Sequence, residues 1–169
     1  MKNISILGAT GSVGQQTLAV VRQHPDKFKI TALAAQKNIV ALAAAAREFR
    51  PELVAIADEG EYQNLKSEIG SLKTEILVGE SGVIEAAKYN ADICVAAIVG
   101  IAGLTPTLAA IEQGKTVALA NKEALVCAGP LMLHAAEKSG AKILPVDSEH
   151  NAIFKCWKII TAIKLKRLF

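Results

Sequence analysis

Residues 8–14 read Gly-Ala-Thr-Gly-Ser-Val-Gly, and this short stretch decides the fold class of the chain. It follows the strand-like run 5–7 and opens a helical pattern over residues 13–23. Glycines in such a turn let the backbone approach a pyrophosphate, while the helix N-terminus supplies N–H donors and a positive dipole. The spacing is GxxGxxG rather than GxGxxG, and a plain strand–helix turn is the alternative. We interpret the stretch as a dinucleotide-binding turn that begins a βαβ unit.

Working outward from this turn, short β-branched runs alternate with helical stretches along the chain. We expect strands at residues 5–7, 30–34, 53–57, 75–78, 93–97, 116–119 and 142–145. We expect helices at residues 13–23, 40–49, 62–69, 83–89, 106–113 and 131–138. Gly114 and Gly140 fall where the C-terminus of a helix favours a positive φ. The pattern predicts an α/β fold, a doubly wound, Rossmann-like parallel sheet with helices on both faces.

Composition and charge narrow the class of protein. A chain of 169 residues that is 51 % hydrophobic suits one domain built on a buried parallel sheet. Its apolar runs are too short to span a bilayer, and we see no leader segment. Three cysteines without a CxxC motif are typical of reduced thiols in the cytoplasm, and we expect them to be buried. Five of the basic residues lie in 155–169, so residues 1–154 carry a charge of −2, which gives no electrostatic case for nucleic acid.

Four segments follow predicted strands and should meet at the carboxyl edge of the sheet, where such folds bind ligands. They are residues 8–14, 35–38, 121–123 and 147–150. The second of these carries no acid, whereas an NAD site usually places Asp or Glu there to bind the ribose hydroxyl. Lys37 would instead favour a 2′-phosphate, so we predict NADP rather than NAD. A solvated lysine in a turn is the alternative interpretation of Lys37.

The third segment, Asn121-Lys122-Glu123, allows two interpretations from the sequence. Lys122 could hold an anionic or carbonyl oxygen of a ligand. The segment could equally be a capped helix start, since Asn is a good N-cap. The residues alone do not decide between these two.

The fourth segment, Asp147-Ser148-Glu149-His150, resembles a hard-cation site at the end of a strand. Asp147 and Glu149 alternate in an extended stretch, so both could face one side and share a divalent cation. Ser148 could donate to substrate oxygens, and we interpret His150 as structural. Mg²⁺ and Mn²⁺ are not distinguished, because both favour oxygen ligands.

Four motifs together carry a family resemblance. They are GATGSVG at 8–14, AAIVGIAGLTPTLAAI at 96–111, LANKEALV at 119–126 and LPVDSEHNAIF at 144–154. On these motifs the chain resembles the 1-deoxy-D-xylulose 5-phosphate reductoisomerases from residue 1 to about 154. The resemblance implies an NADPH-binding domain over 1–145 and the start of a catalytic domain over 146–154.

The resemblance also implies roles for individual residues. Residues implied in NADPH binding are Thr10, Gly11, Ser12, Val13, Gln36, Lys37, Asn38, Asn121 and Glu123. Lys122 and Ser148 would contact the sugar phosphate, and Asp147 and Glu149 would bind Mg²⁺ or Mn²⁺, with Glu149 also touching substrate. Gln36 stands where the family commonly has Gly.

The family reaction converts 1-deoxy-D-xylulose 5-phosphate to 2-C-methyl-D-erythritol 4-phosphate in non-mevalonate isoprenoid biosynthesis. It depends on NADPH and a divalent metal. The resemblance therefore implies a bacterial cytoplasmic oxidoreductase whose small-molecule substrate is a sugar phosphate, with no nucleic-acid or membrane partner. Full-length members of the family are homodimers.

The last residues, 155–169, form a basic tail that we cannot match to the family. We interpret the tail as the product of a frameshift or premature stop; a basic amphipathic helix on a membrane surface is the alternative. Family chains are considerably longer and supply a third metal carboxylate. We therefore expect a truncated reductoisomerase that binds NADPH but shows little or no turnover.

Two other hypotheses remain at this point. The GATGxVG turn also occurs in aspartate-semialdehyde-type dehydrogenases, whose nucleophilic cysteine forms a thioester. Cys127 would be the candidate for that nucleophile. The remaining hypothesis is a non-catalytic NADPH-binding fragment or an unstable remnant.

Overall fold

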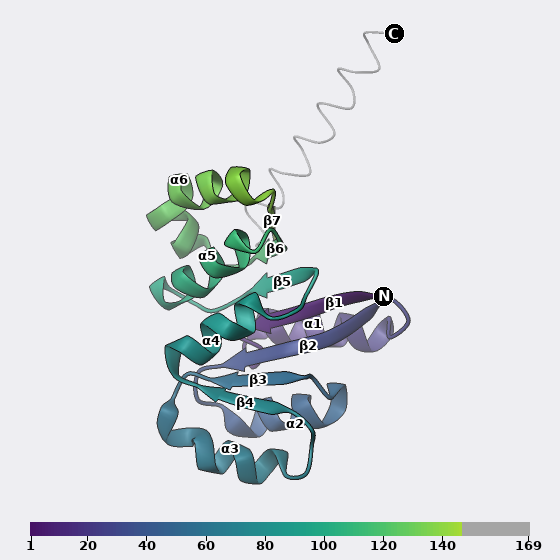
Figure 1. The fold of residues 1–169 in the computed structure, drawn as a ribbon. Coiled ribbons are helices and arrows are strands. Elements are labelled where there is room, and N and C mark those ends of the chain that lie inside the picture. Colours follow the sequence, from purple (N-terminus) through teal and green to yellow (C-terminus); the bar gives the residue numbers. More distant parts are fainter. Residues whose placement is uncertain (147–169) are drawn as a thin grey trace, which may run out of the picture.

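The computed structural model describes residues 1–146, which form a seven-stranded parallel sheet (Figure 1). The strand order is β4-β3-β2-β1-β5-β6-β7, so the chain builds outward from β1 first in one direction and then in the other. The strands are β1 (Lys2–Leu7), β2 (Phe28–Ala35), β3 (Leu53–Ile56), β4 (Glu75–Val78), β5 (Ile93–Ala96), β6 (Thr116–Leu119) and β7 (Lys142–Pro145). This reversal of direction beside β1 is the switch point where doubly wound folds bind ligands.

Helices cover both faces of the sheet, each face with its own apolar core. On one face lie α1 (Ser12–Gln23), α2 (Ile39–Phe49) and α3 (Tyr62–Ile69). On the other lie α4 (Gly79–Lys88), α5 (Leu104–Glu112) and α6 (Lys122–Ser139). Short 3₁₀ turns, η1 (Glu59–Glu61) and η2 (Ile101–Gly103), precede α3 and α5. The predicted α/β fold class is confirmed.

Alternation along the strands fills the two cores. In β1, Ile4 and Ile6 pack with α1–α3 while Leu7 faces α4–α6, as a strand with a period of two requires. In β2 the alternation is interrupted between Ile30 and Ala32, where the register with β1 shifts. Thr31 is the extra residue of this bulge, and its hydroxyl donates to the Ile4 oxygen over 3.3 Å. The sequence pattern did not reveal the bulge.

Most predicted elements agree with the structure to within a few residues, and the last helix does not. The bounds of β4, β6, β7 and α3 match the prediction. Helix α6 begins at Lys122, not at residue 131, because it continues through a kink with non-helical φ and ψ at Ala128. Pro130 lacks the N–H of a normal helical hydrogen bond, so it bends α6 without starting it. Among the helices of residues 1–146, none has both the length and the apolar character needed to cross a membrane.

Candidate functional site

A cleft of about 460 Å³ opens at the carboxyl edge of the sheet, where β1, β2 and β5 end. Gly8 and Gly11 line it from the glycine turn, and Ala35 and Gln36 line it from the end of β2. The opposite wall comes from the segment after β5, through Ala97, Ile98, Val99 and Ala102. The structure thus brings the first two predicted segments together in one cleft.

The structure gives a different account of each of the three glycines in the turn. Gly8 has φ +83°, and a Cβ there would lie 2.5 Å from the Ala97 oxygen. A Cβ on Gly14 would lie 2.3 Å from the Gly8 oxygen, so Gly14 lets α1 pack closely on the turn. A Cβ on Gly11 would make only an ordinary 3.4 Å contact with the Gly8 oxygen. The packing of the protein requires glycine at 8 and 14, whereas the exposed Gly11 presents a bare backbone to the cleft.

The N-terminus of α1 presents backbone N–H groups beside Gly11, which has no side chain to cover them. Gly11 is the N-cap residue and supplies no side-chain acceptor. The first N–H groups of the helix, at Ser12 and Val13, have no partner inside the helix. Thr10 is half-buried beside them and Ser12 is exposed. The arrangement suits an anion such as a pyrophosphate, because N–H groups and the helix dipole act in the same direction.

The end of β2 carries the predicted 2′-phosphate residues. Gln36, Lys37 and Asn38 are all exposed, and Gln36 lines the cleft. The Asn38 side-chain oxygen accepts from the Ala41 N–H over 3.1 Å, which caps α2 and leaves the side-chain NH₂ for another partner. Lys37 therefore lies between Gln36, which lines the cleft, and Asn38, whose side chain caps α2 and stabilises this turn.

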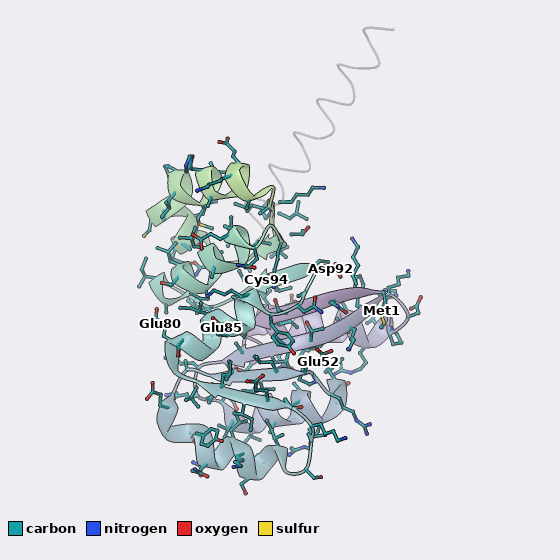
Figure 2. The ribbon with its side chains drawn as sticks, viewed as in Figure 1. Met1, Glu52, Glu80, Glu85, Asp92 and Cys94 are labelled. Carbon is teal, nitrogen blue, oxygen red and sulfur yellow. The ribbon has the colours of Figure 1, made fainter. Side chains whose placement is uncertain are left out.

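Glu80 is a cleft residue that the sequence analysis missed. It lies in the first turn of α4, which begins at Gly79 rather than at residue 83 as predicted. Figure 2 shows Glu80 toward the carboxyl edge of the sheet, whereas Met1 and Asp92 lie toward the opposite edge. The sequence signal that could have revealed Glu80 is Val78-Gly79, a predicted strand end followed directly by a glycine. In the structure this glycine has φ +73° and begins α4.

The third segment, residues 121–123, starts α6. Asn121 is 1 % exposed, and its side-chain oxygen accepts from the Ala124 N–H over 2.9 Å. Its NH₂ group donates to the Ile98 oxygen over 2.6 Å and to the Gly100 oxygen over 2.8 Å. The capped helix start is confirmed. Lys122 and Glu123 are exposed on the first turn of this helix, next to the wall of the cleft that Asn121 contacts.

The fourth segment, Asp147 to His150, lies outside the described residues. Strand β7 ends at Pro145, and the Val146 N–H donates to the Leu119 oxygen over 3.0 Å, so the chain reaches the carboxyl edge at Val146. Within residues 1–146, no three His, Cys, Asp or Glu side chains gather as a metal site. The metal ligands Asp147 and Glu149 therefore stay a prediction.

The two cysteines within residues 1–146 have contrasting surroundings. Cys94 is buried in β5, and burial raises the pKa of its thiol to about 11. Cys127 is exposed on α6, so the expectation that the cysteines are buried is wrong at this position, and it does not line the cleft of the glycine turn. Neither placement resembles a nucleophile facing a bound dinucleotide, because Cys94 stays protonated and Cys127 lies outside that cleft.

The comparison with known proteins agrees with this geometry. The profile of the 1-deoxy-D-xylulose 5-phosphate reductoisomerase family matches residues 4–129. The chain belongs to that family. It is 55 % identical over 157 residues to the reductoisomerase of Geobacillus sp. (strain WCH70), an alignment that covers 92 % of this chain and 41 % of that protein. The chain thus spans about two fifths of the length of this relative.

Two further reductoisomerases extend the comparison. The protein of Acaryochloris marina is 50 % identical over 171 residues, covering 99 % of this chain and 43 % of its own length. This alignment includes most of residues 155–169, which the sequence analysis left unmatched. A crystal structure of a reductoisomerase in complex with NADPH, fosmidomycin and magnesium superimposes with a TM-score of 0.88 at 48 % identity, covering 92 % of this chain and 39 % of that one.

Proposed function

We propose that this reductoisomerase chain binds NADPH in the cleft at the carboxyl edge of its sheet. The observation that carries the proposal is Gly11, a glycine that the protein's own packing does not require, placed at the uncapped N-terminus of α1. A backbone without a Cβ at this position lets a pyrophosphate approach the first N–H groups of the helix. Residues 1–145 would form the NADPH-binding domain, and residues 146–154 would begin the catalytic domain.

The cofactor would lie across the cleft from the end of β2 to the segment after β5. Thr10, Gly11, Ser12 and Val13 would hold the phosphates of the bridge. Lys37, with Gln36 and the NH₂ group of Asn38, would bind the 2′-phosphate at the end of β2. Because β2 and β5 flank β1 on opposite sides, the nicotinamide half would extend toward the segment after β5.

The reaction that we propose is the family's rearrangement and reduction of 1-deoxy-D-xylulose 5-phosphate. Bound NADPH would supply the hydride. Lys122 and Ser148 would bind substrate oxygens, and Glu123 would line the cofactor site from the first turn of α6. Asp147 and Glu149 would hold Mg²⁺ or Mn²⁺, because their carboxylates are the hard oxygen ligands that these ions prefer. Glu149 would also contact the substrate.

Titration of the purified chain with NADPH tests the cofactor proposal. We expect the fluorescence of the nicotinamide to change on binding, with saturation at micromolar NADPH and weaker binding of NADH. A calorimetric titration under the same conditions would give the stoichiometry. No saturable binding by a chain that melts cooperatively would overturn the proposal.

A further inference from the structure

One face of the sheet loses its helical cover toward β7. Helices α1, α2 and α3 form one core with the sheet and lie over β1 to β4, and no other helix of residues 1–146 contributes to that core (Figure 1). On the opposite face, α5 and α6 extend the helical layer over β6 and β7. Because a parallel sheet is normally covered on both faces, the outer part of the first face lacks a layer that such a sheet requires.

A row of paired residues across four strands shows where the cover ends. Ile6 of β1 pairs with Val95 of β5. Val95 pairs with Ala118 of β6, and Ala118 pairs with Leu144 of β7. Paired residues of neighbouring strands point to the same face, which for this row is the face of α1–α3. Exposure rises along the row, from 0 % at Ile6 and 5 % at Val95 to 37 % at Leu144. The cover therefore ends between β5 and β7.

The adjacent row of side chains points to the other face and stays covered. Cys94 of β5 and Val117 of β6 are fully buried, and their neighbour Ile143 of β7 packs half-buried against the core of α4–α6. Leu144 is thus exposed because of the face that it occupies. Val146, two residues further along and so on the same face, is 41 % exposed. We call the surface of Ala118, Leu144 and Val146 the open face.

The described part of the chain ends on this open face. Val146 is its last residue, and its N–H donates to the Leu119 oxygen over 3.0 Å, so the chain is still held against β6 there. Residues 147–150 separate it from a mostly apolar stretch, residues 151–169. A link this short closes a small loop, so the entropic cost of bringing the stretch back onto the neighbouring strands is low.

The sequence of this last stretch suits packing on a sheet. Ile153, Trp157 and Ile160 recur at spacings of four and three, which is typical of one side of a helix. Lys155 and Lys158 fall on the other side of the same periodic pattern. A helix over the whole stretch would be about 28 Å long, which exceeds the width of two strands that lie about 5 Å apart.

We propose that residues 151–169 cover the open face of β6 and β7. The apolar side of the stretch lies against Ala118, Leu144 and Val146, and the lysines of its other side face water. This packing completes the helical layer that α1–α3 begin, and it removes apolar side chains of the sheet and of the stretch from water together. The proposal concerns the end of this chain and does not depend on the cofactor.

The fluorescence of Trp157 in the full chain tests the proposal directly, because the sequence contains no other tryptophan. We expect its emission at a shorter wavelength than in the denatured chain. We also expect acrylamide to quench it about threefold less, because a packed indole is shielded from the quencher. Equal quenching in the native and denatured chains would overturn the proposal.

A matched pair of substitutions tests which surface is covered. Leu144→Asp places a carboxylate on the open face, where covering it leaves a buried charge without a partner, so quenching of Trp157 should rise about twofold or more. Leu133→Asp makes the same change on α6, where Leu133 is 56 % exposed, and should leave quenching unchanged. A larger effect of Leu133→Asp would place the stretch on α6 and overturn the proposal.

A second pair leaves residues 1–146 intact and so decides the matter even if Leu144→Asp does not fold. Ile160→Asp places a charge on the apolar side of the stretch, and Ala162→Asp places the same charge among the lysines of the other side. We expect only Ile160→Asp to raise the quenching of Trp157, again about twofold or more. Unchanged quenching in Ile160→Asp, or an equal rise in both variants, would overturn the proposal.

Two other partners for the stretch predict different behaviour. If a second copy of the chain covered it, the protection of Trp157 would grow with protein concentration. If a membrane surface covered it, protection would appear only after vesicles of phosphatidylserine and phosphatidylcholine are added. We expect protection without lipid that stays constant over about a hundredfold range of protein concentration. Either of the other two results would overturn the proposal.

Discussion

Gly8 and Ala97 approach so closely that a Cβ on Gly8 would lie 2.5 Å from the Ala97 oxygen. The Ala97 N–H donates to the Leu7 oxygen over 2.9 Å, so β1 and the end of β5 stay hydrogen-bonded up to this point. On the other side, the Gly8 N–H donates to the Ala34 oxygen over 2.9 Å. Gly8 is thus required by the meeting of three strand ends, independently of any ligand.

Gly8→Ala should therefore destabilise the fold. An alanine at φ +83° is strained and meets the Ala97 oxygen, so we expect the free energy of unfolding to fall by about 2 kcal/mol or more. Chemical denaturation measures this. Gly70→Ala is the matched control, since Gly70 has φ +64° with no atom within 4 Å of a Cβ, and it should cost less. Equal losses in the two variants would contradict the steric account.

Gly11→Ala should act on binding and not on stability. Its Cβ makes only an ordinary contact within the protein, so we expect the free energy of unfolding to stay within about 0.5 kcal/mol. The methyl group would hold a pyrophosphate away from the N–H groups of α1, and NADPH should bind about tenfold more weakly. A fluorescence titration beside a denaturation curve checks both. Unimpaired NADPH binding would show that the pyrophosphate does not bind at this turn.

Lys37→Ala should reduce the preference for NADPH over NADH. Losing one charge partner of the 2′-phosphate costs about 1–2 kcal/mol of NADPH binding and leaves NADH nearly unchanged. Calorimetric titration with both cofactors measures the ratio. Lys27→Ala, an exposed lysine just before the amino end of β2, is the control and should leave the ratio alone. An unchanged ratio of NADPH to NADH affinity in Lys37→Ala would show that the 2′-phosphate does not bind at Lys37.

The buried thiol of Cys94 predicts a loss of stability at alkaline pH. Burial raises its pKa to about 11 in the folded chain, from 9.0 as the ordinary value. The unfolded chain therefore releases this proton first, and the contribution to stability is complete below pH 9 and lost as the pH rises toward 11. The loss amounts to about 2–3 kcal/mol.

Denaturation curves of the parent chain and of Cys94→Ala between pH 8 and 11 would show this. The variant should lose less stability over the interval, whatever its stability at pH 8. Cys127→Ala changes an exposed cysteine and should keep the pH dependence of the parent chain. A parallel pH dependence in the parent chain and in Cys94→Ala would show that another group is responsible.

The proposed metal ligands predict a separation between metal and cofactor binding. Asp147→Asn and Glu149→Gln should weaken Mn²⁺ binding about tenfold or more, because each removes a charged oxygen ligand. Neither residue belongs to the segments that we propose to bind the cofactor, the glycine turn and residues 36–38, so NADPH should bind as before, with or without EDTA. Electron paramagnetic resonance of Mn²⁺ measures the free ion. Full Mn²⁺ affinity in both variants would exclude these carboxylates as ligands.

Some of the site could be predicted because it rests on local chemistry. The glycine turn, Lys37 and the cap at Asn121 each follow from residue types beside a strand or helix end. Glu80 was missed because α4 starts earlier than its apolar pattern indicates. The residues allowed a helix start at Asn121 but did not predict one continuous helix from there to Ser139, because a proline inside a helix removes a hydrogen bond; the structure carries α6 past Pro130 with a kink at Ala128.

Long-range partners could not be predicted. Lys115 reads as a surface lysine, yet it is 8 % exposed and its ammonium donates to the oxygens of Ala87, over 2.9 Å, and Tyr89 near the end of α4. Burial lowers the pKa of this lysine. Nothing in the neighbouring sequence indicates a partner 28 positions away.

The sequence by itself determined the strand–helix alternation, and it predicted the edge of the sheet and the 2′-phosphate preference on which the proposed function rests. These follow from periodicity and from the side chains that end each strand, which are local properties. Only the tertiary structure decided that Gly8 and Gly14 serve packing while Gly11 does not, and that Asn121 holds the wall after β5. Such distinctions depend on distances between segments far apart in the chain, and packing alone sets those distances.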